Sequence, residues 1–175
     1  MKINEKIKSF KNTNNTQSKP DTIKRATKLI SNSSKGIIIV GAGIKYTSGF
    51  KPVIELAEYL NVPIVTAAGH GDAIPFNHKL NAGQMGPRGN PVATKLTKES
   101  DIILAIGTRL GFNSTFLSYE YINKKAKIIQ IELEKKMLGK YFPIQIGINA
   151  DAETTANQLL REFKKQKIKS EVKIW

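Results

Sequence analysis

The sequence contains no cysteine, which excludes a disulfide framework and any metal site built from thiolates. No apolar run approaches the ~20 residues that a membrane-spanning helix requires. The N-terminal residues are charged and lack the apolar stretch that follows them in a secretory signal. We therefore expect a cytoplasmic protein without a membrane anchor.

Arginine is also scarce, although the formal net charge is +14. Only 4 of the 28 basic residues are arginine, and arginine is the side chain that favours bidentate contacts to phosphates and base edges. Many of the lysines gather near the two ends of the chain. This pattern favours solvated basic ends over a nucleic-acid interface, which stays as the weaker alternative.

The usual signatures of a catalytic site are missing. The chain has no Gly-x-Ser-x-Gly elbow, no phosphate-loop lysine and no cysteine nucleophile. The two histidines, His70 and His78, share a glycine-containing segment with Asp72, but no further ligand stands at a spacing typical of zinc sites. We therefore predict no catalytic residue and no metal ligand in this chain.

Short apolar runs alternate with segments whose apolar residues recur at helical spacing. The expected strands are residues 37–40, 62–66, 102–106, 128–131 and 144–148. The expected helices begin behind an N-cap at Asp21 or Thr22 and cover residues up to 30, then 50–60, 91–98, 134–139 and 152–165. This order predicts an α/β fold with a doubly wound, Rossmann-like parallel sheet of five to six strands.

The composition also predicts how the chain is divided. Residues 1–20 are rich in Lys, Asn, Ser and Thr and have few apolar side chains, so we expect a flexible lead-in. Residues 21–165 form one domain, and residues 166–175 form a basic tail. Long loops are expected at residues 67–89 and 107–125.

Two loops could contribute to a ligand site. Gly41, Ala42 and Gly43 follow the first strand, where a glycine turn can bring backbone N–H groups close to a phosphate. A full dinucleotide fingerprint would have a third glycine in place of Tyr46 and an acidic residue in place of Thr66. Classical NAD binding is therefore disfavoured, and glycines that merely allow a tight turn are the main alternative.

Arg109 is the strongest single candidate. It follows the strand at 102–106, and open α/β sheets bind ligands at the carboxyl ends of their strands. A guanidinium there can bind a diphosphate through two hydrogen bonds. The doubly wound topology predicts that Arg109 lies beside the turn at 41–43, although the two are far apart in sequence.

Taken in order, eight segments of the chain resemble the central domain of thiamine-diphosphate-dependent enzymes of the acetolactate synthase and sulfoacetaldehyde acetyltransferase type. They include the first strand with its glycine turn, the stretch Gly69-His70-Gly71-Asp72, and the strand that ends in Gly107-Thr108-Arg109. The segments are residues 20–26, 37–43, 55–66, 69–75 with His78, 83–86, 101–110, 126–132 with 138–140, and 150–152. The resemblance covers about residues 20–165 and implies a sheet of six strands.

The resemblance also implies what the chain does not carry. In this family an N-terminal domain supplies the glutamate that activates thiamine diphosphate, and a C-terminal Gly-Asp-Gly domain binds magnesium and the diphosphate. Neither pattern is expected in these 175 residues. The resemblance therefore implies a structural role, with the missing domains or a homo-oligomer as partners, and thiamine diphosphate and magnesium only in the full-length enzyme.

Some members of the family bind FAD or ADP across this domain. The positions that match here are Gly41, Ala42, Gly43, Thr66, Gly86, Gly107, Arg109, Glu132 and Asp151. Flavin-binding members continue after the arginine as Arg-Phe-Asp-Asp-Arg, whereas this chain reads Arg109-Leu110-Gly111-Phe112-Asn113, and Glu132 replaces the usual aspartate. FAD or ADP is thus a candidate ligand, and a free-standing FAD- or ADP-binding module is the alternative function.

Overall fold

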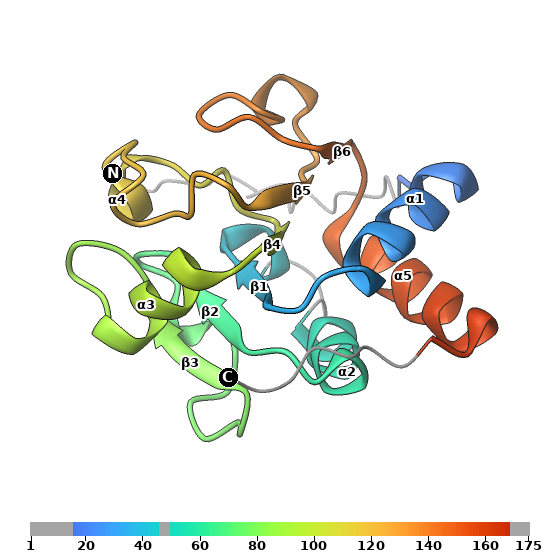
Figure 1. The fold of residues 1–175 in the computed structure, drawn as a ribbon, viewed down its shortest axis with the longest axis horizontal. Helices are drawn as coiled ribbons and strands as arrows, with labels where there is room; N and C mark the ends of the chain where they lie inside the picture. Colours follow the sequence, from blue (N-terminus) through green and yellow to red (C-terminus); the bar gives the residue numbers. More distant parts are fainter. Residues whose placement is uncertain (1–15, 46–49, 169–175) are drawn as a thin grey trace, which may run out of the picture.

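A single six-stranded parallel sheet forms the centre of the molecule (Figure 1), as seen in a computed structural model that describes residues 16–45 and 50–168. The strand order is β3-β2-β1-β4-β5-β6, so β1 and β4 lie side by side in the middle. The strands are β1 (Gly36–Val40), β2 (Ile64–Thr66), β3 (Asn81–Gln84), β4 (Ile102–Ile106), β5 (Lys127–Ile131) and β6 (Ile146–Ile148). The predicted doubly wound fold is confirmed, with six strands.

Helices cover both faces of the sheet. The α-helices are α1 (Pro20–Ser31), α2 (Phe50–Leu60), α3 (Pro91–Glu99), α4 (Phe112–Thr115) and α5 (Ala152–Gln166). Three short 3₁₀ turns are η1 (Ala42–Ile44), η2 (Gly71–Ala73) and η3 (Lys135–Met137).

The central strands are buried on both faces because every residue in them is apolar or glycine. Alternate residues of β1 point to opposite faces. Ile38 packs in the core formed with α1, α2 and α5, whereas Ile37 packs in the core formed with α3. Burial on both sides fixes the register, in which Val40 pairs with Ile106 and both strands end together.

Four features differ from the sequence-based expectation. β3 lies inside the segment that we expected to be a loop, and α4 is an additional short helix. Helix α1 begins at Pro20 after Lys19, rather than behind Asp21 or Thr22, because proline is well suited to the first helical position. The expected helix at 134–139 is reduced to the single turn η3.

The segment before α1 is attached to the last helix. Ser18 N–H donates to Gln158 Oε1 (3.0 Å), and Gln158 Nε2 donates back to the carbonyl of Ser18 (3.0 Å). Residues 1–15 and 169–175 lie outside the described residues, so the flexible lead-in and the basic tail stay predictions for those positions. Within the described residues, none of the helices has the length and apolar character needed to cross a bilayer.

Candidate functional site

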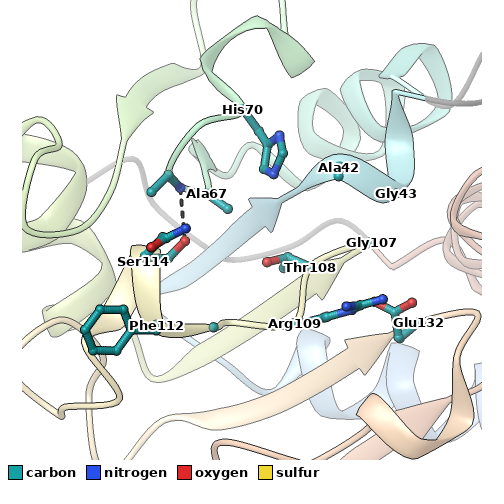
Figure 2. A pocket seen from close by; sticks show the side chains of 13 residues that line it. Ala42, Gly43, Ala67, His70, Gly107, Thr108, Arg109, Phe112, Ser114 and Glu132 are labelled. Atoms are coloured by element: carbon teal, nitrogen blue, oxygen red, sulfur yellow. Dashed lines mark hydrogen bonds between the residues drawn. The ribbon is translucent and has the colours of Figure 1, made fainter.

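A cleft of about 590 Å³ lies at the carboxyl edge of the sheet and is lined by the loops after β1, β2, β4 and β5. This is the switch point of the doubly wound topology, the place where such sheets bind ligands. Figure 2 shows its two walls. One consists of the loops after β1 and β2, and the other of the loops after β4 and β5. The lining residues are Ala42, Gly43, Ala67, Ala68, His70, Gly107, Thr108, Arg109, Gly111, Phe112, Asn113, Ser114 and Glu132.

Two glycine-containing loops touch at the base of the cleft. Gly43 N–H donates to the carbonyl of Gly107 (2.9 Å), and Gly41 N–H donates to the carbonyl of Ile106 (3.2 Å). A Cβ on Gly43 would stand 2.6 Å from the Gly107 Cα, and Gly107 itself has φ of +59°. Because no side chain fits between these backbones, glycine is required on both sides of the contact.

This contact changes what the glycine turn can offer a ligand. The N–H groups of Gly41 and Gly43 already have partners inside the fold. The first task of the turn is therefore to let the β1 and β4 loops meet. Whether it also contacts a ligand stays a prediction.

Arg109 lies at the rim of the cleft, close to the β1 turn as its position in the topology predicted. Its Nη2 donates to Glu134 Oε2 (3.0 Å), and its side chain is 52% exposed. Lys136 Nζ approaches the other oxygen of Glu134 at 2.7 Å. The hydrogen bond from Lys136, together with the charges of Lys136 and Arg109, holds the pKa of Glu134 below its usual value.

The ion pair leaves Arg109 available for a further partner. A guanidinium carries five N–H groups in a fixed fork, and the structure gives only one hydrogen bond to this one among the described residues. The exposed guanidinium can therefore receive an anionic group while Glu134 holds it in place. Glu132 lines the cleft nearby, and its Oε1 accepts a hydrogen bond from Glu134 N–H (3.3 Å).

The structure brings five of the nine predicted positions to the cleft and places four elsewhere. The five that line it are Ala42, Gly43, Gly107, Arg109 and Glu132. Gly41 packs against the loop after β4, where a Cβ would stand 2.6 Å from the Gly107 carbonyl oxygen. Thr66 is buried at the end of β2, and its hydroxyl finds no hydrogen-bond partner among the described residues.

The last two predicted positions have structural contacts instead. Gly86 has φ of +100°, and a Cβ there would stand 2.6 Å from the Ser114 carbonyl oxygen. Asp151 caps α5, where its Oδ1 accepts from Thr154 N–H (2.8 Å). Neither is among the residues that line the cleft.

Sequence reasoning missed the lining residues contributed by α4 and by the loop after β2. Ser114 Oγ accepts from Ala68 N–H (3.0 Å), so it joins the two walls. Phe112 lines the same wall as Arg109. His70 faces the cleft from the opposite wall, and its buried Nδ1 has no hydrogen-bond partner among the described residues. An isolated polar or aromatic loop residue carries no periodic signal that could have identified it.

Among the described residues, no group of three or more His, Asp or Glu side chains could hold a metal ion. Asp72, the acidic residue nearest in pattern to a Gly-Asp-Gly motif, accepts a 2.7 Å hydrogen bond from Lys45. This bond holds the pKa of Asp72 below its usual value, so the carboxylate serves as an ion-pair partner.

Residues 23–159 match the family model described as the central domain of thiamine pyrophosphate enzymes. The chain belongs to this family. The match includes all six strands of the sheet and the loops that form the cleft, so the sequence resemblance is confirmed.

Two of the curated relatives carry names of the types that the resemblance predicted. The central domain is 35% identical over 145 residues to the sulfoacetaldehyde acetyltransferase of Roseovarius nubinhibens, covering 82% of this chain and 24% of that protein. It is 31% identical over 141 residues to a probable acetolactate synthase large subunit of Methanocaldococcus jannaschii, covering 81% of this chain and 24% of that protein. The chain thus spans about a quarter of the length of these relatives.

A solved structure shows the same fold. The central domain superposes on benzoylformate decarboxylase from Polynucleobacter necessarius with a TM-score of 0.70 and 21% sequence identity. The similarity covers 83% of this chain and 27% of that chain. At this level of identity the comparison supports the architecture alone.

Proposed function

We propose that this central domain is the scaffold of a thiamine-diphosphate-dependent transferase or lyase in the cytoplasm, similar to sulfoacetaldehyde acetyltransferase or acetolactate synthase. Domains with the activating glutamate and the magnesium site, on the same or another polypeptide, complete the enzyme, alone or as an oligomer. The relatives support this proposal because each is about four times as long as the matched region. In the completed enzyme, thiamine diphosphate supplies the stabilised carbanion chemistry.

We further propose that the cleft holds an adenine nucleotide such as ADP or FAD. The supporting observation is the position of Arg109, exposed at the switch point beside the β1 turn and held by Glu134. The cleft volume of about 590 Å³ lies in the range of small-ligand sites. Since the N–H groups of Gly41 and Gly43 are already bonded, Arg109 would be the main contact of the diphosphate.

Calorimetry with ADP and FAD on the purified chain tests this second proposal. Arg109→Ala should weaken nucleotide binding by roughly 1.5–3 kcal/mol, the scale of a charged hydrogen bond. Arg161→Ala is the matched control, because Arg161 is exposed on α5 and does not line the cleft. Equal affinity of Arg109→Ala and the unchanged chain would remove Arg109 from the site, and no binding by either would reduce the domain to a scaffold.

A binding experiment with thiamine diphosphate tests the scaffold role. With magnesium present, we expect no specific binding of thiamine diphosphate by the purified chain, because Asp72 is paired with Lys45 and no acidic cluster accompanies it among the described residues. Tight, magnesium-dependent binding of thiamine diphosphate in calorimetry would contradict the proposal that other domains carry the thiamine diphosphate and magnesium sites.

The coding sequence on either side of this one distinguishes the scaffold hypothesis from that of a free-standing nucleotide-binding module. A glutamate-containing thiamine domain encoded upstream and a Gly-Asp-Gly domain encoded downstream would support the scaffold. If both are absent and ADP or FAD still binds, the free-standing module is the better explanation.

A further inference from the structure

One end of the cleft carries an exposed aromatic ring. Phe112 lines the cleft, and 60% of its surface is exposed. The Phe116 ring packs beside it, with centroids 5.0 Å apart and an interplanar angle of 39°. Phe116 in turn contacts the edge of Tyr121 at 5.9 Å. The Phe112 ring is therefore supported by Phe116 while more than half of the surface of the residue stays exposed.

The backbone under this ring is held on both sides. Ser114 and Thr115 are buried, and Ser114 Oγ accepts from Ala68 N–H across the cleft. Thr115 Oγ1 is within hydrogen-bond distance of the carbonyl of Gly111 (3.1 Å) and accepts from Leu117 N–H (3.0 Å). A ring on such a fixed turn loses little conformational freedom when a ligand packs on it.

The turn after Phe112 also has an unusual backbone. Phe116 and Leu117 adopt φ of 47° and 55°, a left-handed conformation that is uncommon for bulky side chains. This conformation ends α4 after four residues and places Phe116 beside Phe112. Such strain persists only where surrounding contacts fix it, and it is concentrated at binding sites.

Arg109 and Phe112 give one wall of the cleft two chemically different ends. Figure 2 shows both side chains on this wall, with the charged group of Arg109 toward one end and the ring of Phe112 toward the other. The opposite wall carries the small side chains of Ala42 and Ala67. This arrangement suits an elongated ligand with an anionic group at one end and a planar apolar ring at the other.

We propose that Phe112 stacks on the planar heterocycle of a nucleotide whose diphosphate lies at Arg109. The inference rests on the proposed nucleotide role of the cleft and adds the residue that selects for the ring. Stacking on an aromatic side chain is tolerant of ring type, so adenine and a flavin ring are both suitable. Asn113, which also lines the cleft, follows Phe112 directly in the sequence and carries an amide suited to the polar edge of such a ring.

The experiment is calorimetry on the full chain with three probes: ADP, FAD and inorganic pyrophosphate. Phe112→Ala should bind at least one of the two nucleotides about tenfold more weakly, while its affinity for pyrophosphate stays unchanged. If Phe112→Ala loses affinity for both ADP and FAD, adenine is the ring that stacks on Phe112. If it loses affinity for FAD alone, the flavin ring is the one that stacks there. Phe112→Trp should retain nucleotide binding, whereas Phe112→Leu should behave as the alanine variant does.

Phe76→Ala is the matched control, because Phe76 is 96% exposed and does not line the cleft. The inference is overturned if Phe112→Ala binds both nucleotides as tightly as the unchanged chain, or if it loses pyrophosphate affinity to the same extent. Failure of the unchanged chain to bind any probe would instead refute the nucleotide role itself, and the inference with it.

Discussion

The first wall of the cleft, from the loops after β1 and β2, presents mainly backbone and small side chains, whereas the second, from the loops after β4 and β5, presents longer ones. On the first wall, Gly43 is locked against Gly107 by a backbone hydrogen bond. On the second, Arg109 and Phe112 are more than half exposed. This difference is the basis for proposing that the first wall sets the shape of the cleft and that the second wall contacts a ligand.

The sharpest test of this division is Gly43→Ala. The added methyl group would stand 2.6 Å from the Gly107 Cα, so the two loops must separate. We expect the free energy of unfolding to fall by about 3 kcal/mol, the upper part of the range for overpacking. Urea denaturation measures it, with Gly71→Ala as control because nothing lies within 4 Å of that position. Equal stability of Gly43→Ala and Gly71→Ala would show that the close contact of Gly43 with Gly107 does not shape the first wall.

Gln130→Leu tests the support beneath the second wall. This buried side chain in β5 donates to the carbonyl of Thr108 (3.1 Å) and accepts from Gly139 N–H (2.8 Å). Leucine would leave both backbone groups without these partners, at about 2 kcal/mol. Denaturation of this variant beside Gln145→Leu, an exposed position, measures the effect. A loss no larger than in the control would show that Gln130 does not hold this wall.

Ser114→Ala removes a bond that crosses between the walls. Without the Ser114 hydroxyl, Ala68 N–H loses its 3.0 Å acceptor. We expect a loss of about 1 kcal/mol in unfolding free energy and faster exchange of the Ala68 amide with solvent. Asn113→Ala, the exposed neighbour, is the control. Unchanged amide exchange would mean that the walls are joined by other contacts.

Arg109→Ala should have the smallest effect on the fold. Its ion pair with Glu134 is about half exposed on the Arg109 side, and exposed pairs contribute less than ~1 kcal/mol. The midpoint of thermal unfolding should therefore stay almost unchanged while nucleotide affinity falls. A large drop in the midpoint would show that the second wall is structural as well.

Much of this fold could be predicted because the central strands are apolar along their whole length. Residues 102–106 form β4 with the predicted bounds, and α2 covers the predicted residues 50–60. β3 could not be predicted, since Asn81–Gln84 shows neither an apolar run nor alternation and each of its residues is only half-buried. It forms because the edge of β2 offers backbone partners, a tertiary effect that local sequence does not encode.

The candidate site, like the fold, could be predicted only in part from the sequence. Topology alone placed Arg109 beside the β1 turn, because parallel strands end at one edge of the sheet. The close packing of Gly43 on Gly107 and the crossing bond of Ser114 depend on distances that only the folded chain defines. The ligand-binding roles of the nine predicted positions stay predictions.

Strand β3 also has a consequence for how copies of the molecule meet one another. An edge strand with free N–H and C=O groups is a template on which another strand can add. Here Gly83 N–H is taken by Asn81 Oδ1 (2.9 Å), and the Gln84 carbonyl accepts from Asn90 N–H (2.6 Å). Gly83 has φ of +90°, and the pairing with β2 shifts register between Ile64 and Thr66. The occupied backbone groups and the irregular pairing of β3 thus make this edge strand a poor template for edge-to-edge aggregation.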